Sequence, residues 1–186
     1  MSIPQTPAPA KYILSILSAS WDTFWPDLQT ELEDRLGPTD YCSGLIAFTQ
    51  TTYYDKELGS PIFRRLLSFS NLRNMEELPE IKIFTNALEN RLAKQGNRTL
   101  NLDPGYLTLE RLVLATGKNF THRVYLGQQI WADLTLVFHG GKWQNLPWTF
   151  PDYATAEIQE HLSSIRQTYH AQIRDRKKTT QPTVCS

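Results

Sequence analysis

The chain has 186 residues and carries 19 Lys and Arg against 19 Asp and Glu, so its formal net charge is zero. This length suits one domain, whose core needs neither a disulfide nor a metal for support. The balanced charge excludes bulk attraction to nucleic acid, membranes or acidic partners, and leaves only local patches for such binding.

The two ends of the chain differ in composition from the part between them. Residues 1–10 hold three prolines and little to bury, so we expect a flexible leader. Residues 11–174 then form a single domain, and 175–186 form a polar tail. The leader lacks the charged and apolar regions of a signal peptide, and no apolar run is long enough to cross a bilayer. We therefore expect a cytoplasmic protein with no membrane partner.

Apolar patterning before the Pro104-Gly105 turn dipeptide predicts alternating strands and helices. The nearly continuous apolar run at 12–17 is typical of a central strand that is covered on both faces. In chain order we predict a strand at 12–17, a helix at 26–36, strands at 45–49 and 62–69, a helix from Pro79 to Gly96, and a strand at 99–103. This order favours the β-α-β-β-α-β arrangement of ferredoxin-like folds.

The rest of the chain predicts an extension of that core. It contains a short helix at 108–116 that Gly117 ends, a strand pair at 120–126 and 130–139, a turn at Gly140-Gly141 into 142–145, and a last helix capped by Thr155. The predicted fold class is therefore α+β, with a ferredoxin-like core, a C-terminal antiparallel hairpin and a terminal helix.

Few sequence motifs name a chemistry. Gly117-Lys118 resembles the end of a phosphate-binding P-loop, but Leu112 stands in place of the first glycine and Asn119 in place of the hydroxyl residue. Gly117 can instead end a helix whose dipole Lys118 complements, or Lys118 can bind an anion. The histidines and cysteines show no metal-ligand spacing, and no serine-hydrolase elbow or dinucleotide-binding glycine turn occurs. We predict no metal site, and the cofactor stays open.

The predicted strand pair carries a more informative polar set. Alternation places His122 with apolar residues, which suits a core histidine or an acid-base group. If residues 127–129 join the two strands, Arg123 lies opposite Asp133 and Tyr125 lies opposite Trp131. Arg123 then forms a cross-strand ion pair, or that face holds a polar ligand.

Three other segments allow both a structural and a functional interpretation. Asp103 precedes a turn dipeptide, where it either accepts turn amides or belongs to a site. The paired tyrosines of "TTYYDKELG" (51–59) either rim a pocket or cover the sheet edge. In "LPWTFPDYAT" (146–155) a Trp, an Asp and a Tyr precede a helix N-terminus, where backbone amides favour anions. These three residues can equally cover the core and support the helix cap.

The segments "FTQTTYYDKELG", "IKIFTNALE", "NLDPGYLTLERLVLATGK", "HRVYLGQQIWADLTL" and "LPWTFPDY" resemble domain-of-unknown-function family 4416. The resemblance runs from about Tyr12 to Tyr169. It implies a bacterial, stand-alone domain and supplies no activity. Members are often labelled GTP-binding protein, yet this chain lacks the Walker lysine loop and an Asn-Lys-x-Asp guanine reader. Phe150 also stands where the family pattern suggests a tyrosine, which removes a hydroxyl.

We expect from this polar set that the protein binds a small ligand bearing phosphate or carboxylate, with nucleotides among the phosphate ligands, and the question of enzymatic activity stays open. Arg123 and Lys118 are expected to bind the anion, and Asp103 and His122 are the candidate catalytic acid-base groups. The remaining candidate ligand-binding residues are Tyr106, Tyr153, Asp152, Tyr53 and Tyr54. The alternative is a non-catalytic interaction module that binds RNA or a protein partner through an aromatic and basic sheet face. The oligomeric state stays open.

Overall fold

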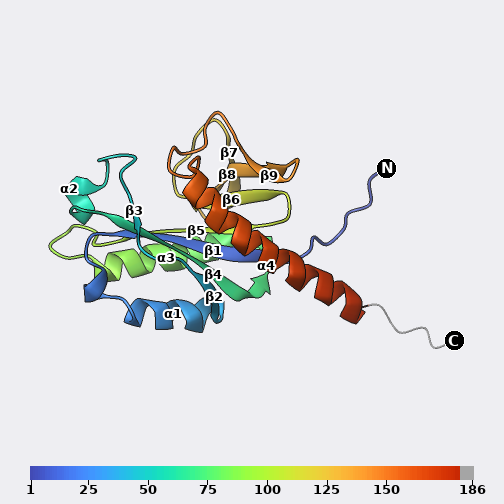
Figure 1. The fold of residues 1–186 in the computed structure, drawn as a ribbon, viewed down its shortest axis with the longest axis horizontal. Helices are drawn as coiled ribbons and strands as arrows, with labels where there is room; N and C mark the ends of the chain where they lie inside the picture. Colours follow the sequence, from blue (N-terminus) through green and yellow to red (C-terminus); the bar gives the residue numbers. More distant parts are fainter. Residues whose placement is uncertain (181–186) are drawn as a thin grey trace.

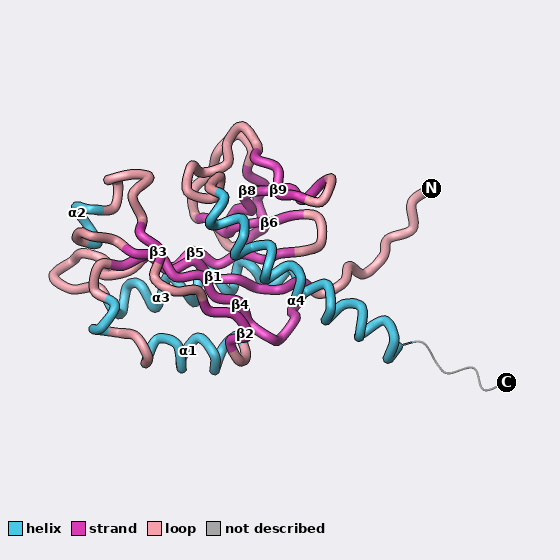
Figure 2. The backbone as a smooth tube through the Cα atoms, viewed as in Figure 1, coloured by secondary structure: helices cyan, strands magenta, loops and turns pink. Residues whose placement is uncertain are grey.

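The computed structural model describes residues 1–180, which form one antiparallel sheet with helices on both of its faces (Figures 1 and 2). Within these residues the sheet has nine strands in the order β2-β4-β1-β5-β6-β8-β7, and β3 and β9 pair with β4 and β8. The strands are β1 (Ala10–Ser18), β2 (Thr39–Cys42), β3 (Ile46–Ala47), β4 (Phe63–Arg73), β5 (Asn101–Leu107), β6 (Arg111–Thr116), β7 (Arg123–Gly127), β8 (Ile130–His139) and β9 (Lys142–Asn145). The helices are α1 (Asp27–Leu36), α2 (Asp55–Leu58), α3 (Leu78–Leu92) and α4 (Ala156–Thr180), with short 3-10 turns at Trp21–Thr23 and Met75–Glu77.

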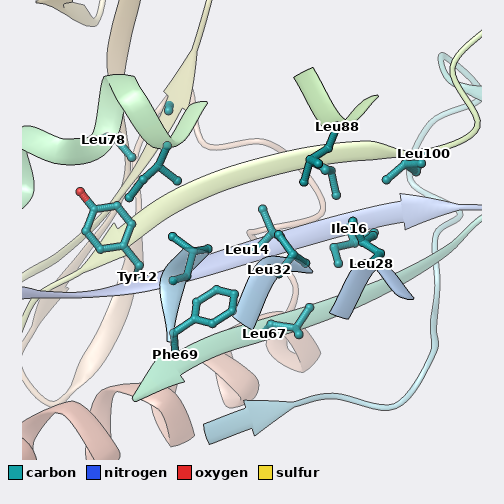
Figure 3. Close-up of a cluster of buried hydrophobic side chains, with 14 of the residues drawn as sticks. Tyr12, Leu14, Ile16, Leu28, Leu32, Leu67, Phe69, Leu78, Leu88 and Leu100 are labelled. Carbon is teal, nitrogen blue, oxygen red and sulfur yellow. The ribbon is translucent and has the colours of Figure 1, made fainter. Parts of the chain in front are cut away.

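The central strand β1 is buried on both faces, as its apolar run predicted. Tyr12, Leu14 and Ile16 point to one face, where they pack against α1 and α3 (Figure 3). Leu28 and Leu32 of α1 come from the helical spacing that predicted this helix, and each is at most 2% exposed. This layer is mainly apolar and forms the larger core of the molecule.

The opposite face of the sheet is covered by α4, which crosses the strands in Figure 1. Ile158, Leu162, Ile165 and Tyr169 pack against apolar residues of β1, β4, β5, β6 and β8, so the predicted inward stripe of this helix is confirmed. The Thr155 Oγ1 accepts a hydrogen bond from the Ile158 amide at 3.4 Å, which supports the predicted cap.

The C-terminal strands follow the predicted register. Arg123 pairs with Asp133 and Tyr125 pairs with Trp131 across β7 and β8. Gly140 and Gly141 have φ angles of 59° and 81°, so both adopt the left-handed conformation that a tight turn between β8 and β9 requires.

The predicted helix at 108–116 is wrong, because residues 111–116 form strand β6 between β5 and β8. Leu112 and Leu114 face α4, whereas Val113 and Ala115 join the core beside α3. A short apolar run that is buried on both faces suits a strand as well as a helix, and here pairing on both edges decides the outcome. Gly117 therefore ends no helix, and Lys118 complements no helix dipole.

The predicted turn at Pro104-Gly105 is also wrong, because β5 runs through both residues. Proline is tolerated there because the recorded pairing with β6 begins only at Gly105. A Cβ on Gly105 would lie 2.5 Å from the Val113 carbonyl oxygen, so only glycine allows β6 to approach this closely.

The sequence pattern did not predict two short elements, and it placed the start of the polar tail within the last helix. β2 and α2 were not predicted, because each has only four residues and no clear periodicity. The last helix continues to Thr180, so residues 175–180 of the expected tail are helical. Residues 181–186 of that tail, with Cys185, lie outside the described residues.

Candidate functional site

A cavity of about 670 Å³ lies on the α4 side of the sheet and is lined by residues from most parts of the chain. Its floor is formed by β1, β4 and β5, and its walls come from α3, from the segment before α2, and from residues in and around β6, β7, β8 and the start of α4. In Figure 1 the α2 segment and the β7–β9 unit both lie above the central strands. The cavity therefore joins segments that are distant in sequence.

The cavity extends between β5 and β6 because these strands diverge. Their recorded pairing covers only residues 105–107 of β5, which leaves Leu102 without a partner from β6. Two side chains of α3 hydrogen-bond the Leu102 backbone instead. Lys82 Nζ donates to the Leu102 carbonyl oxygen at 2.8 Å, and Glu89 Oε1 accepts from the Leu102 amide at 2.6 Å. Charged side chains thus reach the cavity from a helix that otherwise packs on the apolar core.

Arg64 of β4 is the most buried cation at the floor, with only 3% of the residue exposed. Its Nη2 donates to Asp152 Oδ2 in a buried ion pair. The guanidinium carbon lies 5.1 Å from the ring centre of Phe48 and 5.0 Å from that of Tyr153. Because two aromatic rings contact this side chain, polar partners are restricted to its N–H edge.

One buried donor near this floor, Arg64 Nε, has no hydrogen-bond partner among the described residues. Tyr153 Oη and Ser15 Oγ are also buried, and they have no partner there except each other. Burial raises the pKa of Tyr153 well above its ordinary value, so its phenol stays protonated and able to donate. Unpaired buried donors are costly, which favours a bound partner at this position.

A second charged cluster forms one wall. Arg98 donates to both carboxylate oxygens of Glu57, at 2.6 and 2.7 Å, and its Nη1 reaches Glu89 Oε2 at 3.2 Å and Asn101 Oδ1 at 2.8 Å. These hydrogen bonds lower the pKa of Glu57, whereas burial raises the pKa of Glu89. Arg98 thereby ties the α2 segment to α3.

The predicted ion pair between β7 and β8 forms a third part of the wall. Arg123 Nε donates to Asp133 Oδ2 at 2.8 Å. His122 Nε2 lies 3.1 Å from the same oxygen, and its ring stacks on Trp148 with 4.8 Å between ring centres. Asp133 is only 2% exposed, so it is a buried anchor for both residues.

The mouth carries the exposed residues of the site. Lys118 Nζ lies 5.9 Å from the ring centre of Tyr53, and among the described residues no carboxylate is within ion-pair distance of it. Tyr53 itself is 68% exposed, whereas burial raises the pKa of neighbouring Tyr54 to about 12. Lys118 is therefore a cation that remains available to a ligand.

Most of the residues expected to form the site converge on this cavity. Tyr106 does not, because alternation along β5 turns it to the opposite face, where its ring lies 6.3 Å from that of Tyr12. His122 does not line the cavity either and contacts it only through Asp133. The expected residues that line it are Tyr53, Tyr54, Asp103, Lys118, Arg123, Asp152 and Tyr153.

Sequence reasoning missed four charged lining residues, namely Lys82, Glu89, Arg98 and Arg64. Arg64 gave one usable signal, since an arginine within a strand pattern that is otherwise buried needs a partner. Lys82 and Glu89 gave none, because charged residues on a helix are ordinarily solvated.

Chemically, the site offers cations, carboxylates and aromatic rings. Among the described residues, no group of His, Cys, Asp and Glu side chains is arranged to hold a metal ion.

No helix in the same part of the chain is long and apolar enough to cross a membrane.

Comparison with known proteins identifies the chain at the family level. The family model "Domain of unknown function (DUF4416)" matches residues 8–169. The chain belongs to this family. The match covers every element that lines the cavity, so the site lies within the family domain. No curated protein and no solved structure matches the chain.

Proposed function

We propose that this protein binds a small anionic ligand, bearing a carboxylate or a phosphate, in the cavity above β1, β4 and β5. The observation that carries the proposal is Arg64, a buried guanidinium at the floor whose Nε has no partner among the described residues. The cavity volume of about 670 Å³ is in the range of small-molecule sites. A charge-assisted hydrogen bond from Arg64 would satisfy this donor.

Other residues supply further recognition in this proposal. Lys118 contributes a second positive charge at the mouth, and Arg123 is held in place by Asp133. Asp103 lines the same cavity and is the candidate acid-base group if the protein catalyses a reaction of the ligand. His122 acts through its contact with Asp133, and therefore as a positioning residue rather than a direct participant.

Thermal unfolding with a panel of carboxylates, sugar phosphates and nucleotides tests this function. A ligand at 100 times its dissociation constant adds about 2.7 kcal/mol to the folded state, which is roughly 5–11 °C in Tm for a domain of this size. We expect at least one anion to give such a shift. Arg64→Lys should reduce the shift strongly, because lysine keeps the charge that pairs with Asp152 but lacks the planar N–H edge.

Arg111→Lys is the matched control, since Arg111 is exposed on β6 and does not line the cavity. Its response to anions should equal that of the unchanged protein. If no anion in the panel stabilises the protein, or if both variants respond equally, the proposed function is wrong.

An interaction module remains the second candidate, because apolar side chains are exposed on and near edge strand β7. Phe120, Val124 and Tyr125 are 63%, 65% and 57% exposed. Stacking of a base on such a ring contributes about 1–3 kcal/mol. Binding of a short single-stranded RNA that Tyr125→Ala weakens, together with no response to small anions, would favour this candidate.

We further propose a ferredoxin-like core and a bacterial, cytoplasmic setting. The order β2-β4-β1-β5, with α1 and α3 in the connections and on one face, supports the former. The resemblance of the sequence to its family supports bacterial origin, and the free thiol of Cys42 suits a reducing compartment.

A further inference from the structure

We infer that the ligand is a small organic acid that carries one negative charge, a hydrogen-bond donor such as an amine or hydroxyl, and an apolar body. This inference rests on the proposed function and narrows it. It separates amino and hydroxy acids from polyanions such as nucleoside triphosphates and pyrophosphate.

The balance of charges in the cavity carries the first step. The lining includes five cationic side chains, namely Arg64, Lys82, Arg98, Lys118 and Arg123. It also includes four carboxylates, namely Glu89, Asp103, Asp133 and Asp152. Four of the cations pair with carboxylates, and Lys118 is the exception among the described residues. A polyanion placed among four fixed carboxylates would meet strong repulsion, whereas a single negative charge can pair with Lys118, which has no ion pair among the described residues.

The geometry at Arg64 sets where the acid group binds. Asp152 occupies the Nη2 side of the guanidinium, and the Phe48 and Tyr153 rings lie against it. The remaining Nε donor is unpaired among the described residues, and the Tyr153 hydroxyl has no partner there other than Ser15. One acid group can accept both hydrogen bonds, and a larger polyphosphate would press its further charges toward Asp152.

Asp103 supplies the acceptor for the donor group. Its carboxylate is 34% exposed and is held by Asn101 at 2.6 Å and Lys82 at 3.4 Å. Arg64 and Asp103 lie on β4 and β5, the two neighbours of β1, at Leu17 and Ser15 respectively. Two strand spacings and the two-residue offset along β1 place their backbones about 12 Å apart, and the side chains that extend from both shorten the distance that one small molecule has to span. Acid and donor groups of one ligand can reach both side chains.

The apolar lining accounts for the third part of the ligand. Leu17, Phe48, Tyr54 and Leu114 all line the cavity, and Tyr53 and Phe150 contribute rings at positions that are 68% and 41% exposed. Such walls stabilise an aromatic or aliphatic body by burial and ring stacking. A purely polar sugar phosphate would leave this lining without a matching partner.

A set of matched probes tests the inference by thermal unfolding and calorimetric titration. L-phenylalanine and phenyllactate carry an acid and a donor, phenylpropionate carries only the acid, and phenethylamine carries only the amine. GTP, ATP and pyrophosphate represent polyanions. We expect the two bifunctional acids to bind at least about tenfold more tightly than phenylpropionate, because a donor to a charged acceptor contributes about 1.5–3 kcal/mol. The amine and the polyanions should bind more weakly still.

The Asp103→Asn variant gives a second, independent readout. It should remove the preference for the bifunctional acids while the response to phenylpropionate persists, and exposed Asp34→Asn should change neither. If polyanions bind as tightly as the bifunctional acids, or if Asp103→Asn leaves the preference intact, the inference is overturned and the proposed function stands. If neither these probes nor any anion of the wider panel binds, both are overturned.

Discussion

The side chains on the two faces of strand β1 are stabilised in different ways, although they belong to the same nine residues. Tyr12, Leu14 and Ile16 enter a mainly apolar layer with α1 and α3. On the other face, Ser15 is 1% exposed and lies beside the cavity, and Lys11 is fully buried beneath α4. One face is explained by apolar packing, and the other also buries the polar side chains of Lys11 and Ser15 beside apolar Ile13 and Leu17.

On that second face, the buried Lys11 finds all its hydrogen-bond partners within the protein. Its Nζ donates to Asp40 Oδ2 at 2.5 Å, to the Phe69 carbonyl oxygen at 3.0 Å and to Gln172 Oε1 at 2.9 Å. Burial lowers the pKa of Lys11, and Asp40 opposes that shift. Arg64 at the other end of the face has one carboxylate partner and an unpaired Nε, and because of that contrast we propose the binding site at its end.

The largest effect is expected from Arg64→Met, which leaves Asp152 without its cation. Breaking one partner of a buried ion pair costs about 3–5 kcal/mol, so the free energy of unfolding in urea should fall by that amount. The double variant with Asp152→Leu should recover much of the loss, because both charges are then removed. A single variant within about 0.5 kcal/mol of the unchanged protein would show that the pair is not buried in solution.

Leu14→Ala should cost somewhat less, about 2–5 kcal/mol, through loss of burial and creation of a cavity in the apolar layer. The side chain is fully buried and lies on the face away from the site. Affinity for anions, measured well below the lowered Tm, should therefore stay unchanged. A loss of affinity would mean that the two faces are coupled rather than independent.

Lys118→Ala should leave stability within about 0.5 kcal/mol, since Lys118 is exposed. It should nevertheless weaken anion binding by about tenfold, because a charge-assisted contact is lost. Lys142→Ala, at an exposed position of β9, is the matched control. Equal affinities of the two variants in calorimetric titration would remove Lys118 from the site.

The smallest effect concerns pH and Glu89, whose pKa is raised in the folded protein by burial. The folded state then holds its proton to higher pH than the unfolded state, so this group lowers stability as pH rises above its ordinary value of 4.5. Glu89→Gln should therefore lose less stability than the unchanged protein between about pH 5 and pH 7. Urea midpoints at the two pH values measure this difference, and an equal or larger loss in the variant would contradict it.

Much of the fold followed from periodicity, and most of the errors lie where tertiary pairing decides. The runs in β1, α1, α3 and α4 are long and regular enough to define their elements. The short run in β6 is ambiguous by itself, and the glycine in Pro104-Gly105 serves the close approach of β6 rather than a turn.

The residues of the candidate site were likewise predicted only in part. Segments rich in polar and aromatic residues predicted Asp103, Lys118 and Arg123, which line one cavity. Tyr106 was misplaced because the error at Pro104-Gly105 hid the alternation of β5. Arg98 reaches the cavity only through the positions of α2 and α3, which no local pattern encodes.

A crystal structure grown with the most strongly stabilising carboxylate probe would test the central claim most directly. Our account predicts ligand density inside the cavity, with an acid oxygen within about 3 Å of Arg64 Nε. Density on the exposed surface of β7, or a cavity that contains only water beside a stabilising ligand bound elsewhere, would contradict it.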